Sequence, residues 1–91
     1  METAYKISIK GRVTGVGFRY STLLKSSEFP SLKGYVRNAA YGEVEVFVQG
    51  EEKEVEQMLA WLRAGPRFSR VDQFDCMKTN LDQSLSEFTI L

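Results

Sequence analysis

A glycine-rich segment followed by an arginine is the part of this sequence best suited to bind an anion. Three glycines, Gly11, Gly15 and Gly17, fall within seven residues, and Arg19 follows two positions later. Backbone amides can converge on one point in such a loop, and a helix N-terminus strengthens the attraction for a negative group. The Arg19 guanidinium can add two parallel hydrogen bonds to phosphate oxygens. The loop and Arg19 are therefore a candidate anion site at the start of a helix.

Two common phosphate motifs do not fit this loop. A Walker loop needs Gly-Lys-Ser/Thr after its last glycine, whereas Gly17 is followed by Phe18 and Arg19. The dinucleotide fingerprint does not fit either. Glycine-rich turns between a strand and a helix are common, so the loop taken alone favours a purely structural turn. For Arg19 the competing interpretation is an ion pair with a surface acid.

The chain has no histidine, and Cys76 is its only cysteine. Ser-His and Cys-His nucleophiles are therefore excluded, and we expect no metal site built from thiolate and imidazole ligands. A lone cysteine cannot form an internal disulfide, so Cys76 is expected to be a partly buried thiol. Trp61 is expected to pack in the core or in a groove of its helix rather than to bind a ligand.

The loop must be held by regular elements, which the apolar spacing predicts. Alternating residues predict a half-buried strand before the loop, and helical spacing predicts a short helix from near Phe18 that stops at Pro30. Two further strands follow, one over residues 34–39 and one that contains Val44, Val46 and Val48. A turn in which Gly42 takes a positive φ joins these two strands. The apolar positions are Tyr5, Ile7 and Ile9 in the first strand, Tyr20, Leu23 and Leu24 in the helix, and Val44, Val46 and Val48 in the third strand.

The apolar spacing in the second half of the chain predicts one long helix and two strands. A helix over Glu51 to Arg63 ends at Gly65-Pro66, and a strand over residues 70–79 carries a bulge. A short last strand contains Phe88 and Ile90. The order βαββαβ plus a short C-terminal strand predicts an α+β, ferredoxin-like sandwich, with two helices on one face of a mainly antiparallel sheet. At 91 residues the chain is expected to form a single domain, 1–91.

Two motifs resemble the signatures of the acylphosphatase family. Gly11 to Arg19 resembles the first signature; Gly34 to Asn38, followed by Gly42-Glu43-Val44 and Gly50, resembles the second. The resemblance covers nearly the whole chain. It implies hydrolysis of acyl phosphates to a carboxylate and inorganic phosphate, without a metal or cofactor. It also implies that Arg19 binds the phosphoryl group, that Asn38 positions the attacking water, and that the phosphate-binding loop consists of Val13, Thr14, Gly15, Val16, Gly17, Phe18 and Arg19.

This chemistry suits the residues present. A carboxylate leaves readily and needs little protonation, so the absence of histidine is permitted. Charge stabilisation and an in-line water provide most of the catalysis in phosphoryl transfer. The neutral Asn38 amide can both donate and accept, whereas a carboxylate would repel the phosphate. A structural role for Asn38 at the turn is the alternative.

Three positions depart from the family pattern. Thr14 stands where glutamine is usual, so any side-chain bracing of the loop is expected to be shorter. Ala39 stands where some members of the family have a hydroxyl residue. Tyr41 stands where many members have an aspartate or another turn former. These departures bear on the orientation of Asn38 and on catalytic efficiency.

The formal net charge of zero hides an uneven distribution. Residues 1–42 hold seven basic and two acidic residues, a charge of +5, and residues 43–91 hold five basic and ten acidic residues, a charge of −5. The basic half contains the predicted anion site. Arg12 and Arg37 in that half are expected to be solvated or in salt bridges.

The first ten residues alternate rather than forming a signal peptide, so a cytoplasmic location is expected. The expected partner is a small acyl phosphate, with inorganic phosphate as product and inhibitor; no nucleic acid or membrane is expected, and the chain is expected to be a monomer.

Two alternatives use the same order of elements. An RNA-recognition module shares the βαββαβ order, and Lys33-Gly34-Tyr35 matches the start of its motif, but the aromatic residues that should follow are missing. A non-catalytic phosphate-binding domain would keep the loop without turnover. Only activity separates that alternative from the enzyme.

Overall fold

The computed structural model describes residues 1–91 and contains five strands and two helices in the predicted order. The helices are α1 (Phe18–Ser26) and α2 (Glu52–Ala64). The strands are β1 (Glu2–Arg12), β2 (Lys33–Ala40), β3 (Glu43–Glu51), β4 (Arg70–Thr79) and β5 (Phe88–Ile90). Neither helix has the length and apolar character needed to span a membrane.

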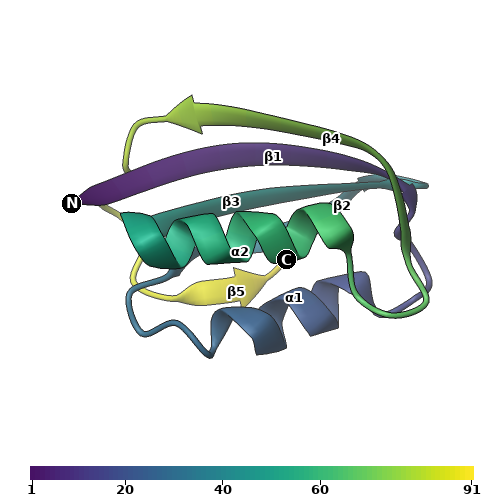
Figure 1. Cartoon of the computed structure of the whole chain (residues 1–91), viewed down its shortest axis with the longest axis horizontal. Coiled ribbons are helices and arrows are strands. Elements are labelled where there is room, and N and C mark those ends of the chain that lie inside the picture. The colour runs from purple at the N-terminus through teal and green to yellow at the C-terminus, as the bar shows by residue number, and fades with distance from the viewer.

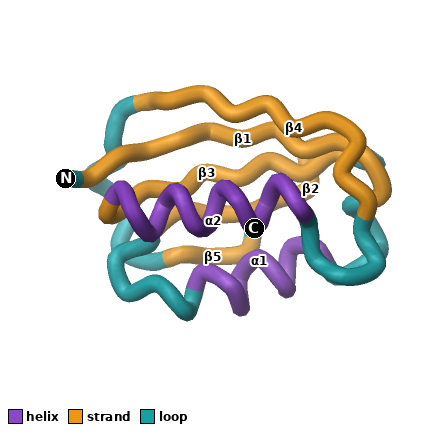
Figure 2. The backbone as a smooth tube through the Cα atoms, viewed as in Figure 1, coloured by secondary structure: helices purple, strands orange, loops and turns teal.

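The five strands form one sheet in the order β4-β1-β3-β2-β5. All neighbours are antiparallel except β2 and β5, which pair in parallel. Both helices lie on the same face of this sheet, α2 across its middle and α1 beside β5 (Figure 1). The tube in Figure 2 shows the same two layers. The predicted ferredoxin-like sandwich is confirmed.

The core lies between the sheet and the helices. Alternate residues of β1 and β3 point into it, because successive side chains of a strand face opposite sides. Ile7, Ile9 and the three valines of β3 are fully buried there. The apolar stripe of α2 covers them with Val55, Met58 and Leu62.

The buried face of α1 differs from the one that the apolar spacing suggests. Tyr20 and Leu24 are 61% and 51% exposed, whereas Thr22 and Ser26 are buried in line with Phe18. The Thr22 hydroxyl donates to the Phe18 carbonyl at 2.8 Å, and the Ser26 hydroxyl donates to that of Leu23. These hydroxyls can enter the core because the helix backbone satisfies them.

The two irregularities of the sheet lie next to the loop after β1. The turn between β2 and β3 has Gly42 at φ 76°, as predicted, and Ala39 is an extra residue on β2 after Asn38. In β4 the register shifts opposite Lys10 and Gly11, which confirms the predicted bulge. A bulge locally bends the strand that carries it and increases its twist, and both bulges lie at the end of the sheet that carries the loop.

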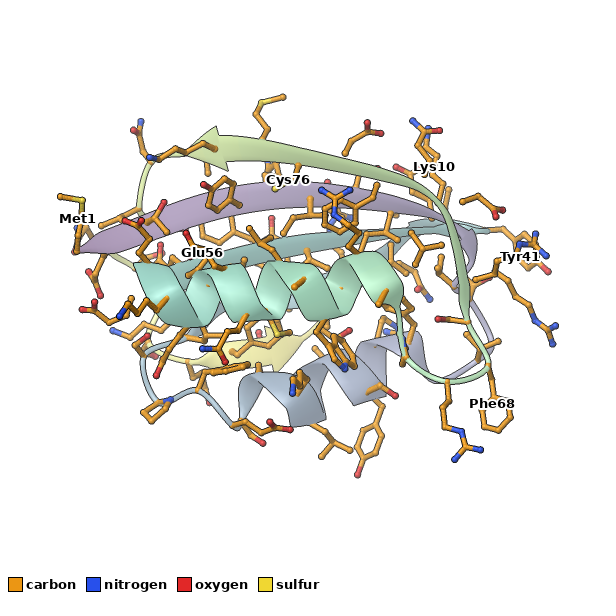
Figure 3. The ribbon with its side chains drawn as sticks, viewed as in Figure 1. Met1, Lys10, Tyr41, Glu56, Phe68 and Cys76 are labelled. Atoms are coloured by element: carbon orange, nitrogen blue, oxygen red, sulfur yellow. The ribbon has the colours of Figure 1, made fainter.

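Cys76 corrects one expectation, since its side chain is exposed rather than partly buried. It lies on β4, which is an edge strand of the sheet, and Figure 3 shows its label well above α2. The helices cover the middle of the sheet and leave this edge open. Trp61 packs against the core from α2, as expected.

Candidate active site

The predicted phosphate-binding loop connects β1 to α1 at one end of the sheet (Figure 1). Gly15 and Gly17 both adopt the left-handed conformation, at φ 72° and 77°, which side chains disfavour. Gly17 is also the N-cap of α1 and offers no side-chain hydrogen bond to the helix. The first amides of α1 are therefore without a capping partner. No acidic side chain occupies the first turn, so these amides remain available to an anion.

Buried residues on either side of the glycines anchor the loop. Val13 and Phe18 are each 1% exposed and belong to the central core cluster. Val16 packs against the same cluster from the tip of the loop. The loop backbone is thus held at both ends and in the middle, which limits the conformations open to its amides.

A cavity of about 210 Å³ lies over this loop and brings the two predicted catalytic residues together. Arg19 enters it from the first turn of α1, and Asn38 enters it from the end of β2. The residues that line it are Val13, Gly15, Gly17, Phe18, Arg19, Tyr20, Asn38 and Ile90. Thr14 and Val16, which were predicted for the loop, do not line the cavity.

Arg19 has no acidic side-chain partner. Its Nη1 atom donates to the main-chain oxygen of Leu91 at 2.8 Å, and none of the salt bridges of the structure includes it. By contrast, Arg37 pairs with Glu45 at 2.9 Å. No aspartate or glutamate side chain therefore pairs with Arg19.

A second arginine near the loop is neutralised. Arg70 and Asp72 lie on β4 beside Gly11 and hydrogen-bond to each other, which lowers the pKa of the Asp72 carboxyl and raises that of Arg70. Arg12 is exposed, as expected, and lies outside the cavity. Among these arginines, Arg19 is the one directed into the cavity.

Asn38 is exposed at the end of β2, paired with Val44 on β3. Its side chain takes no part in the hydrogen bonds of the neighbouring hairpin, where Arg37 instead binds Glu45 and the Gly42 amide binds Thr14. This disfavours the structural role at the turn. The Asn38 amide group is free to bind a water molecule.

Thr14 connects the loop to the hairpin that carries Asn38. The Gly42 amide donates to the Thr14 hydroxyl at 3.3 Å, and the Gly11 amide donates to the Gly42 carbonyl at 3.0 Å. The short Thr14 side chain thus reaches the turn. The β1–α1 loop and the β2–β3 turn are thereby held against each other at this end of the molecule.

Sequence reasoning missed three residues at the site. Tyr20 and Ile90 line the cavity, and Leu91 binds Arg19 through its main chain. Ile90 reaches the site only because β5 pairs beside β2, opposite Val36. No local pattern signals this pairing; the available signal was the apolar Phe88 and Ile90 alternation near the end of the chain.

No group of three or more His, Cys, Asp or Glu side chains in the structure is placed so that it could hold a metal ion. The positive groups at the cavity are those of Arg19 and the loop amides. The arrangement can hold a tetrahedral oxyanion and place a water molecule next to it.

The chain matches one protein family over nearly its whole length. The family model that matches the chain, over residues 5–90, is described as Acylphosphatase. The acylphosphatase of Aliivibrio fischeri is 38% identical over 87 residues, which cover 96% of this chain and 94% of that protein. The acylphosphatase of Photobacterium profundum is 47% identical over 70 residues, 77% of each chain.

A solved structure agrees with these relatives. The crystal structure of acylphosphatase from Bacillus subtilis superposes with a TM-score of 0.89 at 30% identity and covers 100% of this chain and 99% of that one. The resemblance noted for the two motifs is therefore confirmed over the whole chain. Together with the loop, the arginine and the asparagine at one cavity, these matches show that the chain belongs to the acylphosphatase family.

Proposed function

We propose that this chain hydrolyses acyl phosphates in the cavity over the β1–α1 loop, with Arg19 and the loop amides binding the phosphoryl group and Asn38 positioning the water. The observation that carries the proposal is the meeting of Arg19 and Asn38 at one cavity over an uncapped helix start. These are the two requirements of phosphoryl transfer: stabilised charge and an oriented nucleophile.

Phosphate binding rests on complementary charge. The amides at the start of α1 lie at the positive end of the helix dipole, and the glycines let a ligand approach the backbone closely. Arg19 adds further N–H donors, since the bond to Leu91 uses Nη1 and leaves other guanidinium hydrogens free. Charge that builds up on the phosphoryl oxygens in the transition state is stabilised by donors that are already in place.

Asn38 orients the nucleophile. Its carbonyl oxygen accepts a hydrogen bond from the attacking water and so holds that water beside the phosphoryl group. The water oxygen forms a bond to phosphorus as the bond from phosphorus to the carboxylate oxygen breaks. The carboxylate leaves with the bonding electrons, and the two water hydrogens remain with inorganic phosphate as dihydrogen phosphate. No strong general acid is needed, because the leaving carboxylate is a weak base.

The reaction is proposed to be independent of metal ions, because the guanidinium and the amides supply the positive charge that a metal would otherwise provide. Benzoyl phosphate hydrolysis, measured in excess chelator, tests this. Turnover that chelator does not change, with competitive inhibition by inorganic phosphate, is expected. Absence of turnover above the spontaneous rate would contradict the enzyme and favour the non-catalytic phosphate binder. Activity lost with chelator and restored by Mg²⁺ would contradict metal independence.

Residues 1–91 are further proposed to act as one domain and as a monomer, in the cytoplasm, without a nucleic-acid partner. Both helices and three strands contribute to a single core cluster, which supports one folding unit. On the helix-free face, Phe47 is buried and stacks on Tyr35 with ring centroids 5.8 Å apart. A buried ring is not available to stack on RNA bases. Size-exclusion chromatography, and RNA titrations at several salt concentrations, test these points.

A further inference from the structure

Two apolar side chains remain exposed at the cavity and have no role in phosphate binding. Tyr20 follows Arg19 on α1 and is 61% exposed, and Ile90 on β5 is 37% exposed. Both line the cavity that holds Arg19 and Asn38. The other apolar residues of the lining, Val13 and Phe18, are fully buried. Tyr20 and Ile90 therefore form the accessible apolar part of the site.

The position of Ile90 is fixed from two sides. It pairs with Val36, two residues before Asn38, and the next amide, that of Leu91, donates to the Val36 carbonyl at 2.9 Å. On the other side the Leu91 oxygen accepts the hydrogen bond from Arg19. The same main-chain segment thus holds the guanidinium and presents Ile90 beside it. Tyr20 is held next to Arg19 by the helix backbone.

The lining combines one charged side chain with accessible apolar surface. Arg19 is its only charged side chain, and no carboxylate lies in it. An acyl phosphate has the matching distribution, with a charged phosphoryl group joined directly to an acyl group. When the phosphoryl group binds the amides and Arg19, an acyl group that stays within the cavity has Tyr20 and Ile90 as its apolar partners.

The size of the cavity limits the acyl group. At about 210 Å³ the cavity is smaller than the roughly 300–1,000 Å³ that drug-sized ligands occupy. It has room for a phosphoryl group and one small group, such as a single ring. A nucleotide or a long acyl chain would extend into solvent.

We propose that Tyr20 and Ile90 form an acyl-group subsite that favours acyl phosphates with an aromatic or branched apolar acyl group over those with a short one. This inference rests on the proposed function, because it assigns the acyl half of the same substrate. Removal of apolar surface from water drives the preference, and the flat Tyr20 ring suits an aromatic acyl group.

The test compares kcat/KM for benzoyl phosphate and acetyl phosphate, whose carboxylates are of similar basicity as leaving groups. Tyr20→Ala and Ile90→Thr are each expected to lower the benzoyl to acetyl ratio by about 5- to 10-fold, toward the low end of what small apolar differences give in a pocket. Tyr20→Phe keeps the ring and should keep the ratio. Ile90→Thr keeps the β-branched shape that suits a strand, so β5 should still form.

Matched controls are Tyr41→Ala and Leu24→Ala. Tyr41 is 97% exposed at the tip of the β2–β3 turn, where Figure 3 shows it at the edge of the molecule, and Leu24 is exposed on α1 outside the cavity. Both should leave the ratio unchanged. Inhibition by inorganic phosphate should also be unchanged in the Tyr20 and Ile90 variants, since phosphate has no acyl group.

The outcomes separate this inference from the proposed function. If the unmodified protein hydrolyses both substrates but the Tyr20 and Ile90 variants change them equally, the subsite is wrong and the enzyme stands. If the unmodified protein hydrolyses neither substrate, the proposed function fails and the subsite fails with it.

Discussion

The Nη1 atom of Arg19 lies 2.8 Å from the main-chain oxygen of Leu91 and donates a hydrogen bond to it. This bond joins the first turn of α1 to the segment after β5, which are 72 residues apart in the sequence. A guanidinium has five N–H donors in a fixed plane. One edge can thus hold the chain while the other donors face the cavity, so the orientation of Arg19 depends on a planar group with several donors.

Replacing Arg19 by lysine should therefore weaken phosphate binding although the charge is kept. A lysine ammonium cannot bind Leu91 and two phosphate oxygens in one plane. Loss of one charged hydrogen bond costs about 1.5–3 kcal/mol, which corresponds to roughly 10-fold or greater weakening of inhibition by phosphate. The inhibition constant for phosphate measures this, and kcat/KM should fall at least as far.

Arg67→Lys is the matched control, because Arg67 is exposed and lies outside the cavity. It should leave both constants unchanged. An Arg19→Lys variant that binds phosphate as tightly as the unmodified protein would show that charge alone suffices.

Asn38→Ala should separate turnover from phosphate binding. The side chain has no structural hydrogen bond to lose, so the fold and the phosphate inhibition constant should change little. Removing a group that orients a reactant or donates to the transition state typically costs about 10²–10³ in kcat. Steady-state kinetics with benzoyl phosphate give kcat and the phosphate inhibition constant, and a thermal melt checks the fold.

Asn80→Ala, at an exposed position after β4, controls for loss of an amide elsewhere. The assignment fails if Asn38→Ala weakens phosphate binding as much as it slows turnover, because Asn38 would then act on the bound anion and not on the water.

Features of the fold that depend on local sequence were predictable, whereas those that depend on long-range packing were not. The glycine loop, Gly42 and the alternation of Ile7 and Ile9 are local features, and each predicted its element correctly. The buried face of α1 was not predictable from hydrophobicity. Thr22 enters the core only because the Phe18 carbonyl accepts its hydroxyl.

The rest depended on which strands become neighbours. The pairing of β5 with β2 brings Ile90 and Leu91 to Arg19, and the edge position of β4 exposes Cys76. Neither arrangement has a short sequence pattern, because both follow from how distant segments pack. Arg19 was singled out by the glycine-rich spacing and Asn38 by motif resemblance, whereas the apolar part of the cavity was found only from the structure.

Thr14→Val tests the connection between the loop and the hairpin. Valine keeps the shape but removes the hydroxyl that accepts the Gly42 amide at 3.3 Å. Since this bond is long, the free energy of unfolding should fall by only about 0.5–1 kcal/mol, the range of a neutral hydrogen bond. Urea unfolding measures the loss, and kcat should fall a few-fold as Asn38 becomes less well placed.

Thr14→Ser is the control, since it keeps the hydroxyl and should retain both stability and kcat. If the valine and serine variants behave alike, the hydroxyl does not account for the change, and Thr14 does not couple the loop to the turn through its hydrogen bond to Gly42.

Cys76 should be a slow nucleophile in spite of its exposure. Partial desolvation raises the pKa of the Cys76 thiol, and the positive charge of Arg63 offsets only part of that shift. The thiolate is the reactive form, so at neutral pH its fraction is smaller than for a cysteine in a peptide. The rate of alkylation by iodoacetamide should rise with pH through a midpoint above that of a cysteine peptide measured in parallel. Arg63→Gln should move the midpoint further up, because it removes the charge that favours the thiolate. A midpoint at or below that of the peptide would contradict the predicted direction.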